Sequence, residues 1–166
     1  MTSEVAQAFI SQALKHLRED FVPKIRRCLE LLSQDEIWWR PNQKSNSIGN
    51  LLLHLCGNVR QWIVAGVGGE VDVRKRDLEF AGCRRRSGPE LLNELEATVE
   101  QAAAVICSLG EPDLLSEHHI QVYDVTSLQS IFHVVEHFSY HTGQIVFITK
   151  MLKDIDLGFY AQLEKS

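Results

Sequence analysis

The chain has 166 residues with 45% hydrophobic residues and a net charge of -5, and this length predicts a single domain over residues 1–166 that buries roughly two thirds of its unfolded surface. The negative charge argues against general nucleic-acid binding, no apolar run approaches the roughly 20 residues of a membrane span, and the polar N-terminus lacks a signal-peptide core. The four cysteines form no C-x-x-C pair, which argues against a disulfide framework or a thiolate zinc site and predicts a reduced, cytoplasmic protein.

Helical periodicity dominates the first half of the chain. The first helical segment is predicted over residues 3–32, and we expect Pro23 to kink or split it. Ser33 and Glu36 match a capping box for a short helical turn. A second helix is expected to start after Ser47 and to end at a cluster of glycines.

Two further helices are predicted in the second half. The third covers residues 87–109, with a proline early and Gly110 after it. The fourth starts at Thr126, where T-x-x-Q matches a capping box, and continues to about Lys153. Residues 111–125 contain a short alternating piece that predicts one strand or an extended arm. Four long amphipathic helices, with a long crossover loop between the second and the third, predict an all-α four-helix bundle.

The fourth helix carries histidines at four-residue intervals, His133, His137 and His141. At about 100° per residue they share one face that continues as Ile148, whereas polar residues such as Thr142 fall on the opposite side. We therefore expect the row to face the bundle interior. Buried imidazoles need partners, and a divalent metal is the natural partner of neutral imidazole nitrogen. A hydrogen-bonded structural histidine cluster is the alternative.

The second helix offers a ligand from a facing element. His54 lies with Asn50, Asn58 and Gln61 on a polar stripe among leucines. This stripe is either the solvent face of the helix or a face turned toward the histidine row. Two histidines at i and i+4 can chelate one ion, and a third ligand must come from another helix, so the inward row favours His54 as that ligand.

A second known motif overlaps the histidine row. His133, Glu136 and His137 match the H-x-x-E-H pattern of inverted zincin peptidases, in which Glu136 would be the general base. The pattern is short, and it leaves His141 and His54 without a role.

Two segments, WWRPNQKSNSIGNLLLHLCGNVRQWI and HVVEHFSYHTGQI, resemble the DinB-like (YfiT-like) superfamily of metalloenzymes. That family has one histidine on the second helix and an H-x-x-x-H-x-G-Q pattern on the last. The resemblance implies an up-down-down-up bundle, a homodimer, and a zinc or nickel site formed by His54, His137 and His141. His133 is then a hydrogen-bond partner of the site, a pocket wall or a core histidine. Gln144 either orients a ligand or makes a packing contact.

The activities of this family are less uniform than its metal site. Some members look like S-transferases that use low-molecular-weight thiols, so the resemblance implies thiol-dependent transfer to a small-molecule substrate. A metal-dependent hydrolase and a non-catalytic metal-binding bundle are the alternatives, and no catalytic residue is predicted. The basic runs Arg74–Arg76 and Cys83–Arg86 are either a solvated loop or a rim that attracts an anionic substrate or thiol.

Overall fold

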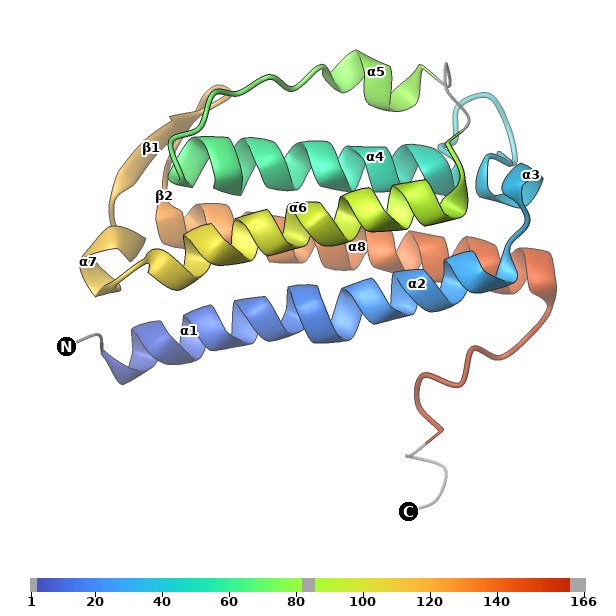
Figure 1. Ribbon diagram of the computed structural model, residues 1–166, viewed down its shortest axis with the longest axis horizontal. Coiled ribbons are helices and arrows are strands. Elements are labelled where there is room, and N and C mark those ends of the chain that lie inside the picture. Colours follow the sequence, from blue (N-terminus) through green and yellow to red (C-terminus); the bar gives the residue numbers. More distant parts are fainter. Residues whose placement is uncertain (1–2, 82–85, 162–166) are drawn as a thin grey trace.

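The computed structural model describes residues 3–81 and 86–161, and its long helices form a bundle (Figure 1). The predicted all-α four-helix bundle is therefore confirmed. The segments that build it are α1 (Glu4–Lys15) with the π-helical η1 (His16–Phe21) and α2 (Val22–Leu31), α4 (Ile48–Val59) with the π-helical η2 (Arg60–Val67), α6 (Gly88–Ser108), and α8 (Ser127–Lys153).

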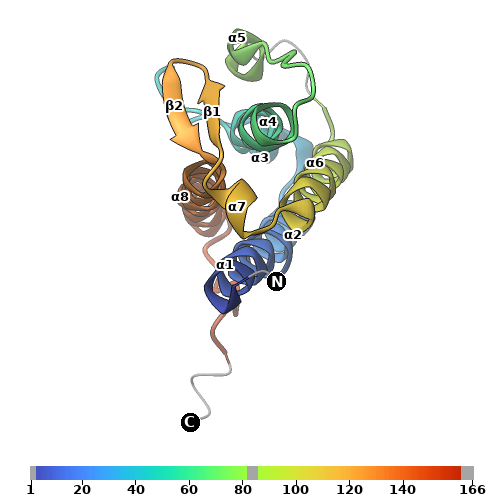
Figure 2. The same cartoon turned by 90° about the vertical axis from the view of Figure 1, so that its left-hand side faces the viewer.

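Each helix of the bundle packs against two others. α8 contacts α2 and α4, while α6 contacts α4 and α2, so α4 lies opposite the α1–α2 segment when the bundle is seen from its end (Figure 2). α4 and α6 run in the same direction, opposite to α2 and α8 (Figure 1). Two parallel neighbours require a long connection, and residues 68–87, here called the crossover, join α4–η2 to α6. Residues 68–81 of the crossover pass along the outer side of α4 (Figure 1).

Capping side chains fix where the helices start. In the predicted box before α3 (Gln34–Ile37), the Ser33 amide donates to Glu36 Oε2 at 2.7 Å. In the predicted box before α8, the Thr126 amide donates to Gln129 Oε1 at 2.8 Å. Ser47 caps α4 in the same way. These caps satisfy amide groups that a helix start leaves without partners.

The irregularity predicted at Pro23 takes the form of a π-helical stretch. Residues 16–21 form η1, and Pro23 follows in the first turn of α2. A proline cannot donate a helical hydrogen bond, so the turn before it must rearrange its backbone bonding.

Residues 111–126 contain more structure than the single strand or arm that was expected. A short helix, α7 (Glu111–Leu114), precedes an antiparallel hairpin of β1 (Glu117–Ile120) and β2 (Tyr123–Thr126), with Glu117 paired to Thr126. Gln121 in the turn has a φ of 59°, the left-handed conformation that tight hairpin turns use. The crossover likewise contains a short helix, α5 (Arg76–Phe80), that periodicity did not indicate.

The hydrophobic core runs the length of the bundle and contains leucine, isoleucine and phenylalanine side chains from all four helical segments. Fully buried examples are Leu17, Ile25, Leu52, Leu55, Leu95, Ile106, Ile131, Phe138 and Ile145. Within residues 3–81 and 86–161, none of the helices combines the length and the apolar character that crossing a bilayer requires.

The buried face of α8 differs from the predicted one. Thr142 was expected on the side opposite the core, but it is 4% exposed and shares the core face with Phe138. Its hydroxyl donates to the Phe138 carbonyl at 2.8 Å, which removes the cost of burial. The prediction placed the middle of the buried face at the histidine row. Because α8 packs against both α2 and α4, the buried face is wider, and the histidine row lies at its edge toward α4.

Candidate metal site

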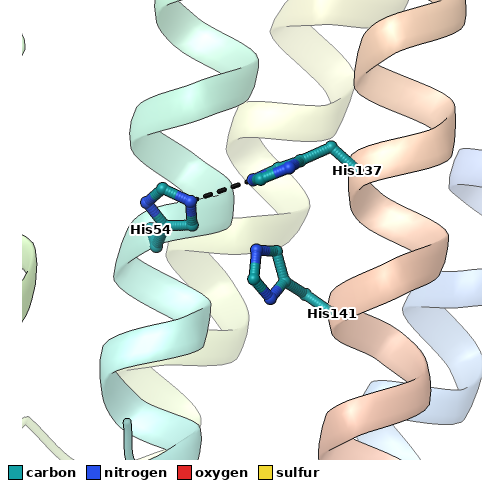
Figure 3. Close-up of side chains that lie close together, drawn as sticks. All are labelled: His54, His137 and His141. Atoms are coloured by element: carbon teal, nitrogen blue, oxygen red, sulfur yellow. Dashed lines mark hydrogen bonds between the residues drawn. The ribbon is translucent and has the colours of Figure 1, made fainter. Parts of the chain in front are cut away.

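Three imidazoles meet between α4 and α8, those of His54, His137 and His141 (Figure 3). We call them the histidine cluster. The Nε2 atoms of His54 and His137 are 2.9 Å apart, and one ring nitrogen from each of the three histidines lies within 4.8 Å of the others. His54 and His141 are each 7% exposed. The structure thus brings together all three predicted ligands, and these residues could hold a metal ion.

Hydrogen bonds orient two of the three rings. His54 Nδ1–H donates to Glu79 Oε2 at 2.8 Å, and His141 Nδ1–H donates to Gln144 Oε1 at 2.8 Å. A carboxylate or amide oxygen accepts a hydrogen bond and cannot donate one, so the ring proton must be on Nδ1. Nε2 is then the unprotonated nitrogen, which is the atom that binds metals.

Two rings of the cluster, His137 and His141, favour the neutral form. Burial, together with the neighbouring imidazoles of His141 and His54, lowers the pKa of His137 to about 3. Burial also lowers the pKa of His141. Near pH 7 His137 and His141 therefore present neutral imidazole nitrogens, the form in which histidine coordinates zinc or nickel. The donor set and its protonation state both fit a divalent cation.

A buried ion pair on the crossover supports His54 from behind. Arg74 Nε donates to Glu79 Oε1 at 2.7 Å, and the side chains of Arg74 and Glu79 are 5% and 9% exposed. Burial alone raises the pKa of Glu79, but the hydrogen bonds from Arg74 and His54 outweigh it and lower the pKa overall. Glu79 therefore stays ionised and remains an acceptor for His54.

Gly57 on α4 makes room for this carboxylate. A Cβ at position 57 would lie 2.1 Å from Glu79 Oε1 and 3.0 Å from Arg74 Nε. A glycine is therefore the residue that lets the crossover approach α4 closely enough to reach His54.

His133 belongs to a wall beside the cluster. Its ring centroid is 4.1 Å from that of Trp62, and its Nε2 lies 3.3 Å from the Asn58 amide nitrogen. Glu136 is exposed. Among the described residues, the group able to hold a metal contains neither His133 nor Glu136, so the geometry does not support the H-x-x-E-H interpretation.

The structure divides the basic runs of the crossover. Arg74 is buried in the ion pair with Glu79, and Arg86 pairs with Glu94 of α6, away from the histidine cluster. Cys83 and the two arginines after it lie outside the described residues. Sequence reasoning missed Glu79 altogether. The signal available was an acidic residue following a basic run, which does not by itself indicate a contact with His54.

A groove of about 470 Å³ adjoins the histidine cluster. It lies between α4, η2 and α8, with the crossover and the hairpin at its edges. Its lining combines the cluster with amide, guanidinium and aromatic side chains: His54, Asn58, Gln61, Trp62, Arg74, Arg76, Gln121, Tyr123, His133 and His137.

Comparison with known proteins agrees with this architecture. Two solved structures are similar: a DinB-like protein, YjoA, from Bacillus subtilis (19% identity, 90% of this chain and 97% of that chain, TM-score 0.66), and a DinB-like protein from Bacillus cereus ATCC 10987 (11% identity, 86% and 90%, TM-score 0.67). At these identities the likeness shows the fold. No curated protein matches the chain. A family model described as "Protein of unknown function (DUF1572)" matches residues 4–161. The chain therefore belongs to the DUF1572 family, one of the DinB-like families.

Proposed function

We propose that the chain binds one divalent metal ion through His54, His137 and His141 and acts as a metal-dependent enzyme. The observation that carries this proposal is the convergence of three imidazoles, two of which have Nδ1 held by an acceptor. The Nε2 atoms of His54 and His137 lie 2.9 Å apart and share a hydrogen bond, which a bound metal ion would replace.

Three protein nitrogens form an incomplete coordination sphere. Structural zinc sites usually have four protein ligands, whereas catalytic sites keep a position open for water or substrate. Bound here, zinc or nickel would act as a Lewis acid and lower the pKa of a water or thiol at its open position. The protein's own contribution is to keep His137 and His141 neutral, to orient His54 and His141 through Glu79 and Gln144, and to provide the adjoining groove.

The reaction we propose is S-transfer with a low-molecular-weight thiol, as the family resemblance suggests. The chain's own cysteines support a small-molecule source for the thiol. Cys28 and Cys56 are buried, and burial raises the pKa of Cys56 to about 12. Cys107 is exposed on α6, and it does not line the groove. None of these three described cysteines can therefore present a thiolate beside the histidine cluster.

Metal analysis of untagged protein tests the site. We expect about one zinc or nickel ion per chain after reconstitution, and a loss of this ion in His54→Ala. A stoichiometry near zero with zinc, nickel and manganese would contradict the proposal.

The reaction requires a separate assay. Loaded protein is mixed with monochlorobimane and with bacillithiol, mycothiol or glutathione in turn, and thiol consumption is compared with His54→Ala. Faster consumption by the unmodified protein supports S-transfer. Equal rates contradict it, and turnover of esters or amides by the same protein would instead support the hydrolase. A bound metal with neither activity supports the non-catalytic bundle.

We also propose that the chain forms a homodimer through α8. Phe132, Tyr140 and Phe147 are each at least 60% exposed along one side of this helix, and contiguous exposed aromatic groups mark contact surfaces. Val135 and Val146, two other apolar residues of α8, are partly buried against the core. The proposed contact surface is therefore the aromatic stripe.

A further inference from the structure

The groove beside the histidine cluster carries a positive charge that its lining does not neutralise. Two guanidinium groups, Arg74 and Arg76, line it, and no described carboxylate does. Glu79 lies behind the groove and pairs with Arg74. Arg76 instead lies over the Phe80 ring, with its Cζ 5.5 Å from the centroid, and within residues 3–81 and 86–161 it has no carboxylate partner. Arg76 therefore adds to the groove a positive charge that no described carboxylate pairs with.

Aromatic rings form one wall of the groove. Trp62 is 5% exposed, and its ring centroid is 4.1 Å from that of His133 and 6.1 Å from that of Tyr123. Because these rings pack against one another, the wall is already formed without a ligand.

Specific contacts hold the hairpin that carries Tyr123. Gln121 Nε2 donates to Gln61 Oε1 on η2, and Ile120 is buried against the bundle. A Cβ at Gly66 would lie 2.4 Å from Ile120 Cδ1, so this glycine permits the close approach. The hairpin that carries Tyr123 is therefore held against η2, the segment that carries Trp62.

We infer that this groove binds a small organic monocarboxylate with an apolar or aromatic body. The carboxylate pairs with Arg76, the body packs on Trp62 and Tyr123, and the other end of the molecule reaches the histidine cluster. The planar guanidinium fork matches a carboxylate in geometry. Arg76 is the one guanidinium of the groove without a described carboxylate partner, so the groove offers a single fork to a single carboxylate. The inference names the substrate class of the proposed enzyme and rests on that function only for the reaction itself.

Metal-free protein provides the test, because a carboxylate can also bind a metal directly. The probes are 3-phenylpropionate, its neutral amide and phenyl phosphate, titrated while the Trp62 indole N–H is followed by NMR, with Trp62→Phe used for assignment. The variant is Arg76→Gln. The control is Lys75→Gln, which removes the same charge from an exposed neighbour that does not line this groove.

We expect 3-phenylpropionate to bind the unmodified protein and Lys75→Gln equally, and to bind Arg76→Gln about tenfold more weakly. The amide should bind all three proteins alike. Equal affinity of Arg76→Gln for the acid, or the absence of a saturable Trp62 shift at millimolar acid, would overturn the inference. Tighter, Arg76-dependent binding of phenyl phosphate would overturn the monocarboxylate assignment.

These outcomes do not depend on the metal. If the protein takes up no zinc or nickel but still shows Arg76-dependent binding of 3-phenylpropionate, the proposed function fails and the groove inference stands. If the metal binds stoichiometrically and Arg76→Gln does not change the affinity for 3-phenylpropionate, the groove inference fails and the proposed metal site stands.

Discussion

Replacing Gly57 by alanine tests whether the crossover holds His54 in position. The added Cβ would lie 2.1 Å from Glu79 Oε1, whereas ordinary contact begins at 3.4 Å. The carboxylate must therefore retreat by about 1 Å. Such a shift is enough to break the 2.8 Å bond from His54 Nδ1 and to loosen the bond from Arg74.

Two opposing effects determine how much Gly57→Ala changes the free energy of unfolding. Alanine favours a helix over glycine by about 1 kcal/mol. Each hydrogen bond to a charged group that is lost costs about 1.5–3 kcal/mol, and Glu79 accepts such bonds from both Arg74 and His54. The loss is the larger effect, so the free energy of unfolding should fall by about 2 kcal/mol in urea titrations followed by circular dichroism. Zinc affinity should fall at least about tenfold, because His54 loses the group that orients it.

The same substitution in a Glu79→Ala background provides the control. Without the carboxylate the clash is removed, and Gly57→Ala should now stabilise the protein by about 1 kcal/mol through helix propensity. It should also leave zinc affinity unchanged relative to Glu79→Ala alone. Equal destabilisation in both backgrounds would refute the reasoning, because the effect would then not pass through Glu79.

Three further predictions concern other parts of the molecule. The pKa of Glu36 is lowered to about 2, chiefly by a hydrogen bond from Lys153. The ionised carboxylate therefore contributes its full stability above its unfolded pKa of about 4.3, and this stability is lost as the pH falls toward 2. Glu36→Gln should therefore lower the free energy of unfolding by about 1 kcal/mol at pH 7 and by much less at pH 2, as measured by urea titration. An equal loss at the two pH values would contradict a stabilising ion pair between Glu36 and Lys153. Phe147→Asp should convert a dimer to a monomer in sedimentation experiments, and a monomeric unmodified protein would exclude the proposed contact. His141→Ala should lose stoichiometric zinc in metal analysis while His133→Ala retains it, and the opposite pattern would revive the H-x-x-E-H interpretation.

The helices and the candidate ligands could be predicted because both follow from local patterns. A capping box such as that of Ser33 or Thr126 involves residues only three positions apart. Histidines at i and i+4, such as His137 and His141, must share one face of a helix. His54 required one further step, the expectation that a third ligand comes from a facing helix.

The groups that support the ligands could not be predicted, because they depend on the path of the crossover. Glu79 lies 25 residues from His54 in sequence, on a five-residue helix whose position depends on a pairing with Arg74. Neither the position of this short helix nor its pairing with Arg74 produces a periodic pattern in the sequence. The buried face of α8 was misplaced for a related reason: which side of a helix faces the core depends on its neighbours, and Thr142 satisfies its hydroxyl within its own helix.

The residues around the groove come from the helices of the bundle and from two segments outside it, the crossover and the hairpin. The histidine cluster belongs to α4 and α8, whose positions the core of the bundle determines, whereas Glu79 and Arg76 belong to the crossover on the outer side of α4. Changes in this surface segment can alter ligand preference and the basicity of a coordinating histidine while the packing of the helices stays intact. A lineage with this architecture can diversify its chemistry by exchanging one loop on an unchanged scaffold.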